Sequence, residues 1–190
     1  MGWSWGASIG VHLAARRPEL LTTLVLLDAG HTDVQDTPGW EESTLEERIA
    51  EWQTSDLSFP DWDALLTLAR ERATDWRPAL EGRIRAGMRE RGGAVVARAD
   101  PRGGAAALHW LGVEPPTSTF SALSGLELPI LLVLASRNDT SAPVERFRTA
   151  VPAAEIRTID SEHDLLAQAA DETIALVGDW VTDVGQPRVA

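Results

Sequence analysis

The stretch MGWSWGASIG, residues 1–10, decides the interpretation of this chain. Within it, Gly2 and Gly6 lie two residues before and after Ser4. This spacing is typical of a sharp turn from a strand into a helix that exposes a serine hydroxyl. The apex of such a turn has strained backbone geometry, and the flanking glycines are expected to let strand and helix approach closely. We therefore predict that Ser4 is a nucleophile, with helix N-capping as its alternative role.

The sequence around this turn alternates between helical segments and short apolar runs. A short, continuous apolar run is typical of a strand buried on both faces of a parallel sheet. Pro18 ends the first predicted helix, since the residue before a proline avoids the helical region. We predict strands over 21–29, 129–136 and 154–160, and helices over 6–17, 143–151 and 170–184. This order predicts an α/β fold with a mainly parallel sheet.

The segment 33–116 has a different composition and is predicted to be a helical insertion, a cap or lid, within a core formed by 1–32 and 117–190. Ser43 and Glu46 have the spacing of a capping box. Further helices are expected from Asp61, over 78–91 and over 102–111. The tryptophans of this segment are interpreted as packing anchors or as the wall of an apolar substrate pocket, and they are Trp40, Trp52, Trp62, Trp76 and Trp110.

Further polar residues lie at the ends of the predicted strands. A serine hydroxyl needs a base within hydrogen-bond reach, and the base needs an orienting carboxylate. His163 follows the last strand and is the predicted base. Asp139 follows the strand before it and is the predicted acid; Asp28, at the end of the first strand, is the alternative acid. The backbone N–H of Trp5 is the predicted oxyanion donor.

Three other residues are candidates for contact with a substrate. Trp3 lies beside Ser4 in the sequence, His31 follows a strand end, and Trp110 belongs to the insertion. The alternative for His31 is an ordinary loop histidine, and the alternative for Trp110 is helix packing. The four histidines have no HExxH pattern, so neither a metal site nor a cofactor is expected.

These residues occur in the chain order Ser, Asp, His, and in that order the chain resembles α/β-hydrolase-fold serine hydrolases with a helical cap. The segments LPILLVLASRND, 128–139, and SEHDLL, 161–166, are similar to the acid and histidine segments of that family. The resemblance covers the C-terminal part of the family's fold. In the family, several strands and an oxyanion loop come before the turn, so we expect Met1 to be an internal position, left by truncation, a misplaced start or a gene fragment.

The resemblance implies hydrolysis of an ester-like or other acyl bond through an acyl-serine intermediate. Lactones, small esters, carbon–carbon cleavage substrates and peracid formation all remain open. The alternative is a catalytically inactive fragment or a half-domain that depends on a partner. A nucleotide-binding module is the weakest reading, since neither GxGxxG nor GxxxxGK[ST] occurs.

The composition of the chain further limits the classes of molecule that we expect it to bind. The net charge of −12 argues against nucleic acid and anionic membrane surfaces, which repel surplus carboxylates. The chain has no cysteine, which excludes disulfides and thiolate chemistry. The longest apolar runs are too short to span a bilayer, so a cytoplasmic protein is expected. The expected partner, a small acyl substrate, is what the resemblance implies. An exposed hydrophobic sheet edge is expected to permit self-association.

Overall fold

The computed structural model of the chain describes residues 1–37, 39–54, 58–73, 75–138 and 140–185. The chain divides into two compact units, one formed by Met1–Glu41 with Leu111–Ala190 and the other by Glu42–Trp110. Residues 33–41 and 111–116, which the sequence assigned to the insertion, belong to the first unit by their contacts.

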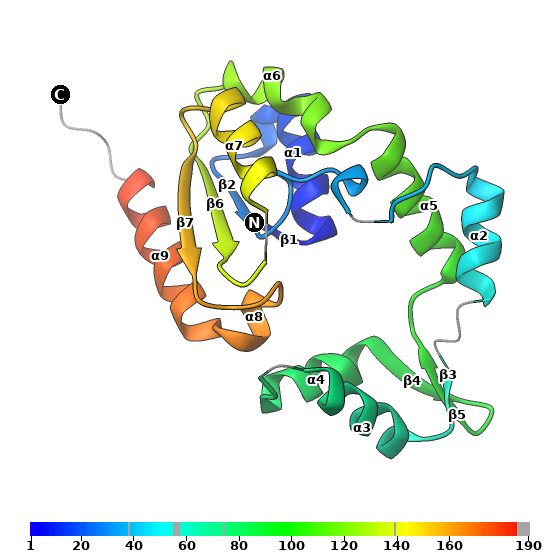
Figure 1. Cartoon of the computed structure of the whole chain (residues 1–190). Helices are drawn as coiled ribbons and strands as arrows, with labels where there is room; N and C mark the ends of the chain where they lie inside the picture. The colour runs from blue at the N-terminus through cyan, green and yellow to red at the C-terminus, as the bar shows by residue number, and fades with distance from the viewer. Residues whose placement is uncertain (38, 55–57, 74, 139, 186–190) are drawn as a thin grey trace. The chain divides into compact units, whose positions relative to one another are not determined.

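The first unit is built on a four-stranded sheet in the order β1-β2-β6-β7, with every pair of neighbours parallel (Figure 1). The strands are β1 (Gly2–Trp3), β2 (Leu24–Leu27), β6 (Ile130–Ala135) and β7 (Glu155–Ile159). Since all strands run in one direction, their carboxyl ends meet at one edge of the sheet. The predicted parallel α/β fold is confirmed, and the segments that follow these four strands are brought to one edge.

Helices cover both faces of this sheet (Figure 1). Side chains alternate along the strands, so Leu24 and Leu26 of β2 face one core while Val25 and Leu27 face the other. The first core includes residues of α1, α6 and α7, and the second includes Trp180 of α9. The helices of this unit are α1 (Trp5–Arg16), α6 (Phe120–Ser124), α7 (Ser141–Ala150), α8 (Leu165–Gln168) and α9 (Ala170–Gly185).

The second unit combines helices with a small antiparallel sheet in the order β3-β5-β4. Its strands are β3 (Ser58–Phe59), β4 (Met88–Arg91) and β5 (Ala94–Ala97). Its helices are α2 (Leu45–Thr54), α3 (Trp62–Arg72) and α4 (Pro78–Gly87), together with most of α5 (Pro101–Val113). The predicted helix starts near residues 61, 78 and 102 are confirmed within a residue or so.

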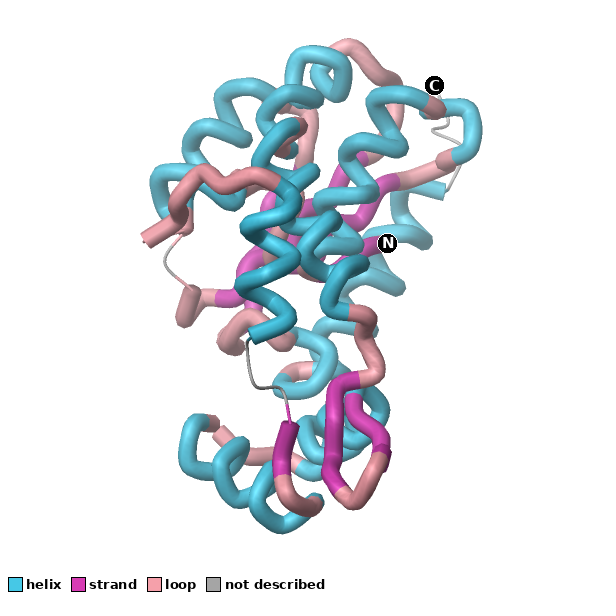
Figure 2. The backbone as a smooth tube through the Cα atoms, turned by 90° about the vertical axis from the view of Figure 1, so that its right-hand side faces the viewer, coloured by secondary structure: helices cyan, strands magenta, loops and turns pink. Residues whose placement is uncertain are grey.

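The helix predicted over 78–91 is wrong in its second half. α4 ends at Gly87, and β4 and β5 then form a hairpin, seen as paired magenta segments in Figure 2. Gly92 and Gly93 connect the two strands with φ values of 61° and 79°, the geometry of a tight hairpin turn. The glycine pair is therefore a turn between strands and not a helix terminus.

The capping box of α2 lies one residue later than predicted. The N–H of Glu47 donates to Thr44 Oγ1 at 3.2 Å, and the N–H of Thr44 donates to Glu47 Oε2 at 2.8 Å. Both Ser43 to Glu46 and Thr44 to Glu47 satisfy the sequence pattern, so the pattern alone does not choose between them.

Tryptophans of the predicted insertion pack within their own units. A Cβ at Gly104 would lie 2.3 Å from the Trp52 ring, so this glycine makes room for that indole. The guanidinium groups of Arg85 and Arg70 lie 4.8 Å and 5.1 Å from the ring centroids of Trp62 and Trp76. These contacts agree with a packing role for Trp52, Trp62 and Trp76.

Candidate active site

Ser4 occupies the turn between β1 and α1. Its backbone has φ 53° and ψ −127°, and its N–H donates to the carbonyl of Leu27 on the neighbouring strand at 3.2 Å. A non-glycine residue with positive φ is uncommon and costs of order 1–3 kcal/mol, so the surrounding structure must hold it in place. The predicted strained turn at Ser4 is present.

The two glycines flanking this turn have different roles. A Cβ built on Gly2 would lie 2.2 Å from the carbonyl oxygen of Gly6, whereas a Cβ on Gly6 would meet nothing within 4 Å. Gly2 is therefore the residue that allows β1 and α1 to approach. The prediction that Gly6 also supplies clearance is wrong, because its Cα faces open space.

We expect Gly2→Ala to lower the free energy of unfolding by about 3 kcal/mol or more, since the added methyl meets backbone that cannot rotate away. Gly6→Ala is the matched control: it is expected to be neutral or to stabilise by up to about 1 kcal/mol, because alanine favours a helix over glycine. Urea unfolding followed by circular dichroism measures both. Equal destabilisation by the two substitutions would contradict this account of the turn.

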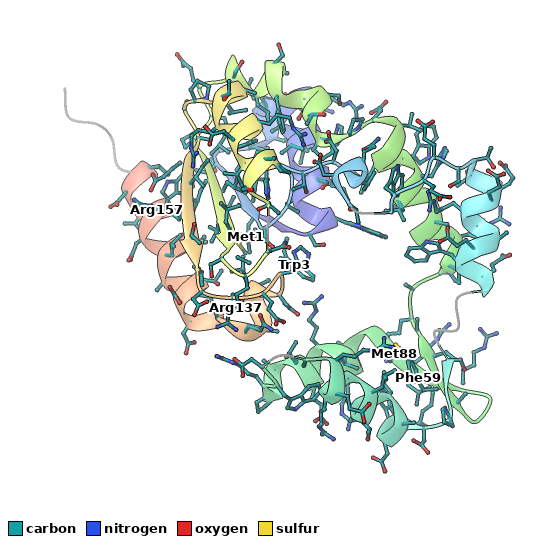
Figure 3. All side chains as sticks on the ribbon, in the orientation of Figure 1. Met1, Trp3, Phe59, Met88, Arg137 and Arg157 are labelled. Carbon is teal, nitrogen blue, oxygen red and sulfur yellow. The ribbon has the colours of Figure 1, made fainter. Side chains whose placement is uncertain are left out.

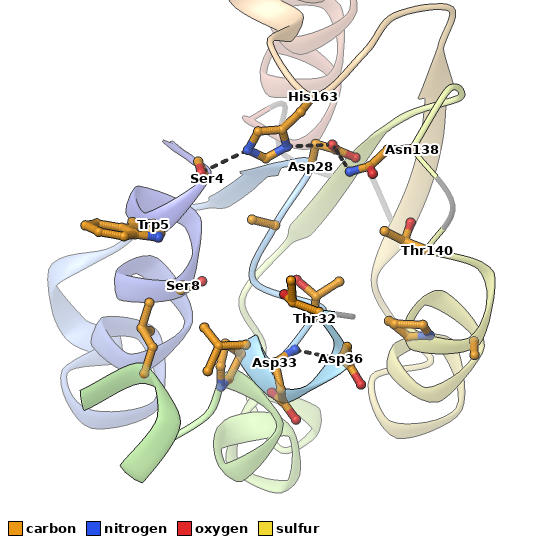
Figure 4. Close-up of a pocket in the computed structure, with 17 residues that line it drawn as sticks. Ser4, Trp5, Ser8, Asp28, Thr32, Asp33, Asp36, Asn138, Thr140 and His163 are labelled. Atoms are coloured by element: carbon orange, nitrogen blue, oxygen red, sulfur yellow. Dashed lines mark hydrogen bonds and ion pairs between the residues drawn. The ribbon is translucent and has the colours of Figure 1, made fainter. Parts of the chain in front are cut away.

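His163, in the loop between β7 and α8, lies between two of the predicted residues (Figure 4). Its Nε2 is 2.9 Å from Ser4 Oγ, and its Nδ1 is 2.8 Å from Asp28 Oδ2. These residues are separated by 159 and 135 positions in the sequence. The sheet therefore brings a hydroxyl, an imidazole and a carboxylate into one hydrogen-bonded chain.

The carboxylate on His163 is Asp28, the alternative acid of the sequence prediction. Asp28 follows β2 with φ 49° and is 3% exposed. Its side chain also accepts the Ala135 N–H and the Asn138 amide, each at 2.9 Å. A buried carboxylate needs such donors, and here three groups supply them. Asp139, the acid that the sequence favoured, lies outside the described residues.

Two side chains hold the histidine loop in place. The indole N–H of Trp3 donates to the backbone carbonyl of His163 at 2.8 Å, and the two rings lie 5.3 Å apart; Trp3 is labelled in Figure 3. On the other side, the buried Gln168 accepts the N–H of Glu162 at 2.8 Å and the hydroxyl of Ser161 at 3.1 Å. Sequence reasoning missed Gln168 and Asn138. Gln168 binds residues 6 and 7 positions earlier, Asn138 binds a residue 110 positions earlier, and no motif encodes either contact.

A cavity of about 500 Å³ lies beside this group, within the first unit. Ser4, Asp28 and His163 line it, and so does Trp5, the predicted oxyanion donor. Trp5 begins α1, so its N–H belongs to the first turn of the helix, where backbone donors suit an anion.

Two of the predicted substrate contacts, Trp3 and His31, are not part of the lining of this cavity. Trp110 belongs to the second unit, and its contact with a substrate stays a prediction. His31 is fully buried, and this burial lowers its pKa below the ordinary value, although nearby Asp28 acts in the opposite direction. His31 is therefore a neutral, buried side chain at neutral pH.

Backbone strain concentrates at the same place. Among the described residues, the non-glycine residues with positive φ are Ser4 and Asp28. Strained backbone conformations cluster at functional sites, where the geometry of a reacting group matters more than its local energy. Because Ser4 and Asp28 are also hydrogen-bonded to His163, this edge of the sheet is the candidate active site.

Two kinds of site are not found in the part of the chain that the structure describes. It contains no group of three or more histidine, aspartate or glutamate side chains arranged to hold a metal ion. Nor does any helix there have the length and apolar character needed to cross a bilayer.

Similarity to solved structures agrees with the fold described above. No family model and no curated protein matches the chain. Its structure is similar to the esterase Rv0045c of M. tuberculosis, with a TM-score of 0.72, 21% identity and 95% of the chain covered. It is also similar to the enol-lactonase of Burkholderia xenovorans LB400 (TM-score 0.67, 20% identity, 95% covered) and to the peroxisomal α/β-hydrolase Lpx1 of Saccharomyces cerevisiae (0.71, 14%, 100%).

The chain spans 61%, 64% and 55% of the lengths of these three structures. At such identities the likeness concerns the fold. Three observations agree: the sheet is parallel, the turn at Ser4 is strained, and the structure matches these proteins. We conclude that the chain has the α/β-hydrolase fold.

Proposed function

We propose that the chain is a serine hydrolase that cleaves ester or related acyl bonds of a small substrate. The observation that carries the proposal is the position of His163, within 2.9 Å of Ser4 Oγ and 2.8 Å of Asp28 Oδ2. A hydroxyl with a base at one side and a carboxylate behind that base is the arrangement that activates serine for attack.

In the first half of the proposed reaction, Ser4 Oγ attacks the acyl carbon while His163 Nε2 takes the hydroxyl proton. Asp28 accepts the Nδ1–H bond, which fixes the tautomer of the imidazole and stabilises its charged form. The backbone N–H of Trp5 supports the negative oxygen of the tetrahedral intermediate. When the intermediate collapses, the bond to the leaving group breaks and His163 gives the proton to that group.

The second half repeats these roles with water. His163 removes a proton from the water as its oxygen attacks the acyl-serine, and then returns a proton to Ser4 Oγ as the acid leaves. Atoms balance as one bond hydrolysed by one water. Asn138 and the Ala135 N–H keep the Asp28 carboxylate in place through both halves.

A half-domain that depends on a partner is the second candidate, and one observation favours it. Trp5, Ile9 and Leu13 follow one another at every fourth position of α1 and are 38%, 64% and 38% exposed. Contiguous exposed apolar side chains are typical of a surface that contacts another polypeptide segment.

Labelling with a fluorophosphonate probe separates the candidates. We expect one probe per chain, with the added mass on Ser4 after digestion, because the reagent bonds covalently to an activated serine. Ser4→Ala should abolish the label, and Ser121→Ala, an exposed serine of α6, should retain it. A chain that is folded by circular dichroism but unlabelled would favour the partner-dependent candidate.

A further inference from the structure

The cavity beside Ser4 contains a second serine that the proposed reaction does not use. Ser8 lies one helical turn after Ser4 on α1 and lines the same cavity. Four residues of helix rise about 6 Å, so Ser4 and Ser8 lie at different depths along one wall of the cavity. Ser8 therefore faces a part of any bound molecule several bonds away from the reacting carbon.

The Ser8 side chain is mostly buried and is directed into the cavity. The residue is 6% exposed, and in Figure 4 its oxygen points toward the space between α1 and Thr32. Within the described residues its Oγ makes no hydrogen bond to a protein group, although its backbone N–H donates to the carbonyl of Ser4 at 3.3 Å. The Oγ is not among the fully enclosed polar atoms, so it is open to a hydrogen-bonding group that enters from the cavity.

The charges that line the cavity restrict what that group can be. The carboxylates of Asp28, Asp33 and Asp36 belong to the lining, and no arginine does among the described residues. Arg146, which lies close by, is held by Asp36 through two hydrogen bonds and lies 3.7 Å from Asp33. Arg146 therefore offsets only part of the negative charge of these three carboxylates.

The charge on Asp36 persists at neutral pH. Burial acts to raise the pKa of its carboxyl, but the hydrogen bonds from Arg146 and from the Asp33 N–H outweigh that effect and hold the pKa below its ordinary value. A ligand carboxylate would therefore meet like charge at this end of the cavity, and like charges in a confined cleft repel strongly.

We propose that Ser8 recognises an uncharged hydrogen-bonding group on the acyl portion of the substrate, and that the cavity disfavours acyl groups ending in a carboxylate. The inference rests on the proposed hydrolase function and names its substrate class: esters of neutral, oxygen-bearing acids. The acyl portion is the relevant one because it becomes bonded to Ser4 in the first half of the reaction and stays in the cavity until water releases it, whereas the leaving group departs after the first half.

The test compares p-nitrophenyl esters of nearly equal length and shape. Hexanoate, 4-methoxybutyrate and 3-ethoxypropanoate differ only by exchange of one methylene for an ether oxygen, and the adipate half-ester adds a terminal carboxylate. We expect kcat/KM for the better ether to exceed that for hexanoate by about tenfold, the value of one good hydrogen bond. The adipate half-ester should react at least about tenfold more slowly than hexanoate, with the gap narrowing at high salt.

Ser8→Ala should reduce the ratio of kcat/KM for the better ether to kcat/KM for hexanoate from about ten to about one. The matched surface variant Ser121→Ala should leave that ratio unchanged. Equal rates for ether and hexanoate, or a Ser8→Ala variant that slows every ester alike, would overturn the inference. So would a Ser8→Ala variant that keeps the ether preference, since a group other than Ser8 would then cause it.

The same inference can be examined without turnover. In the Ser4→Ala chain, saturation-transfer NMR with the corresponding methyl esters should show tighter binding of the ether than of hexanoate, and Ser4→Ala/Ser8→Ala should remove the difference. A chain that discriminates in binding while the Ser4 chain hydrolyses nothing would reject the hydrolase proposal alone. A chain that hydrolyses hexanoate without discrimination would reject the Ser8 inference alone.

Discussion

Asp28→Asn is expected to lower kcat for p-nitrophenyl hexanoate by about 10⁴-fold, the cost of the equivalent change in a serine-protease triad. Asp28 accepts hydrogen bonds from His163, Ala135 and Asn138. An asparagine that keeps its oxygen toward Ala135 turns its NH₂ toward the imidazole and the Asn138 amide. His163 would then adopt the tautomer that cannot take a proton from Ser4.

Asp139→Asn is the matched control for this prediction. The Nδ1 of an imidazole donates one hydrogen bond, and Asp28 accepts it, so kcat is expected to stay within about one order of magnitude of the original. Steady-state kinetics of both variants, with circular dichroism to verify folding, decide the matter. A large loss in Asp139→Asn with little change in Asp28→Asn would reassign the acid to the residue that the sequence favoured.

His163→Ala is expected to have the larger effect, about 10⁶-fold in kcat, comparable to loss of the histidine in a serine-protease triad. No other described side chain contacts Ser4 Oγ by a hydrogen bond, so the hydroxyl would lose its base. Fluorophosphonate labelling of Ser4 should slow in parallel, since the probe reports the same activation.

His109→Ala serves as the control for that experiment. His109 lies in the second unit, where its Nδ1 is 3.3 Å from the carbonyl of Ser43, and it plays no part in the proposed reaction. Its substitution should leave kcat and labelling nearly unchanged. Activity of His163→Ala within tenfold of the original chain would rule out the proposed roles of Ser4 and His163 together.

The sequence predicts the sheet well because burial leaves a local signature. Both β2 and β6 are buried along their full length, and continuous apolar runs of that kind are typical of parallel strands. Ser4 was also predictable, since its turn is encoded by neighbours within two residues. The hairpin of the second unit was not, because Gly92 and Gly93 suit a helix terminus and a hairpin turn equally well.

The sequence alone could not decide whether Asp28 or Asp139 is the acid that orients His163, and the reason is different. In the sequence, each follows a predicted strand, so the pattern does not choose between them. The features that the structure adds for Asp28 are its backbone φ of 49° and the donors at Ala135 and Asn138, all of which depend on tertiary structure. Ser8 likewise has no sequence signal of its own: it lies between Ala7 and Ile9 of α1, and its role depends on the cavity.

The backbone conformation at Ser4 also limits which nucleophiles the position can accept. Threonine, the other aliphatic alcohol, is branched at Cβ, and branched side chains are genuine outliers at positive φ. Cysteine has the unbranched shape that fits. Aspartate is also unbranched at Cβ, and Asp28 adopts φ 49° in this same structure, so a carboxylate fits this backbone as well. Divergence at Ser4 is therefore limited to side chains without a branch at Cβ.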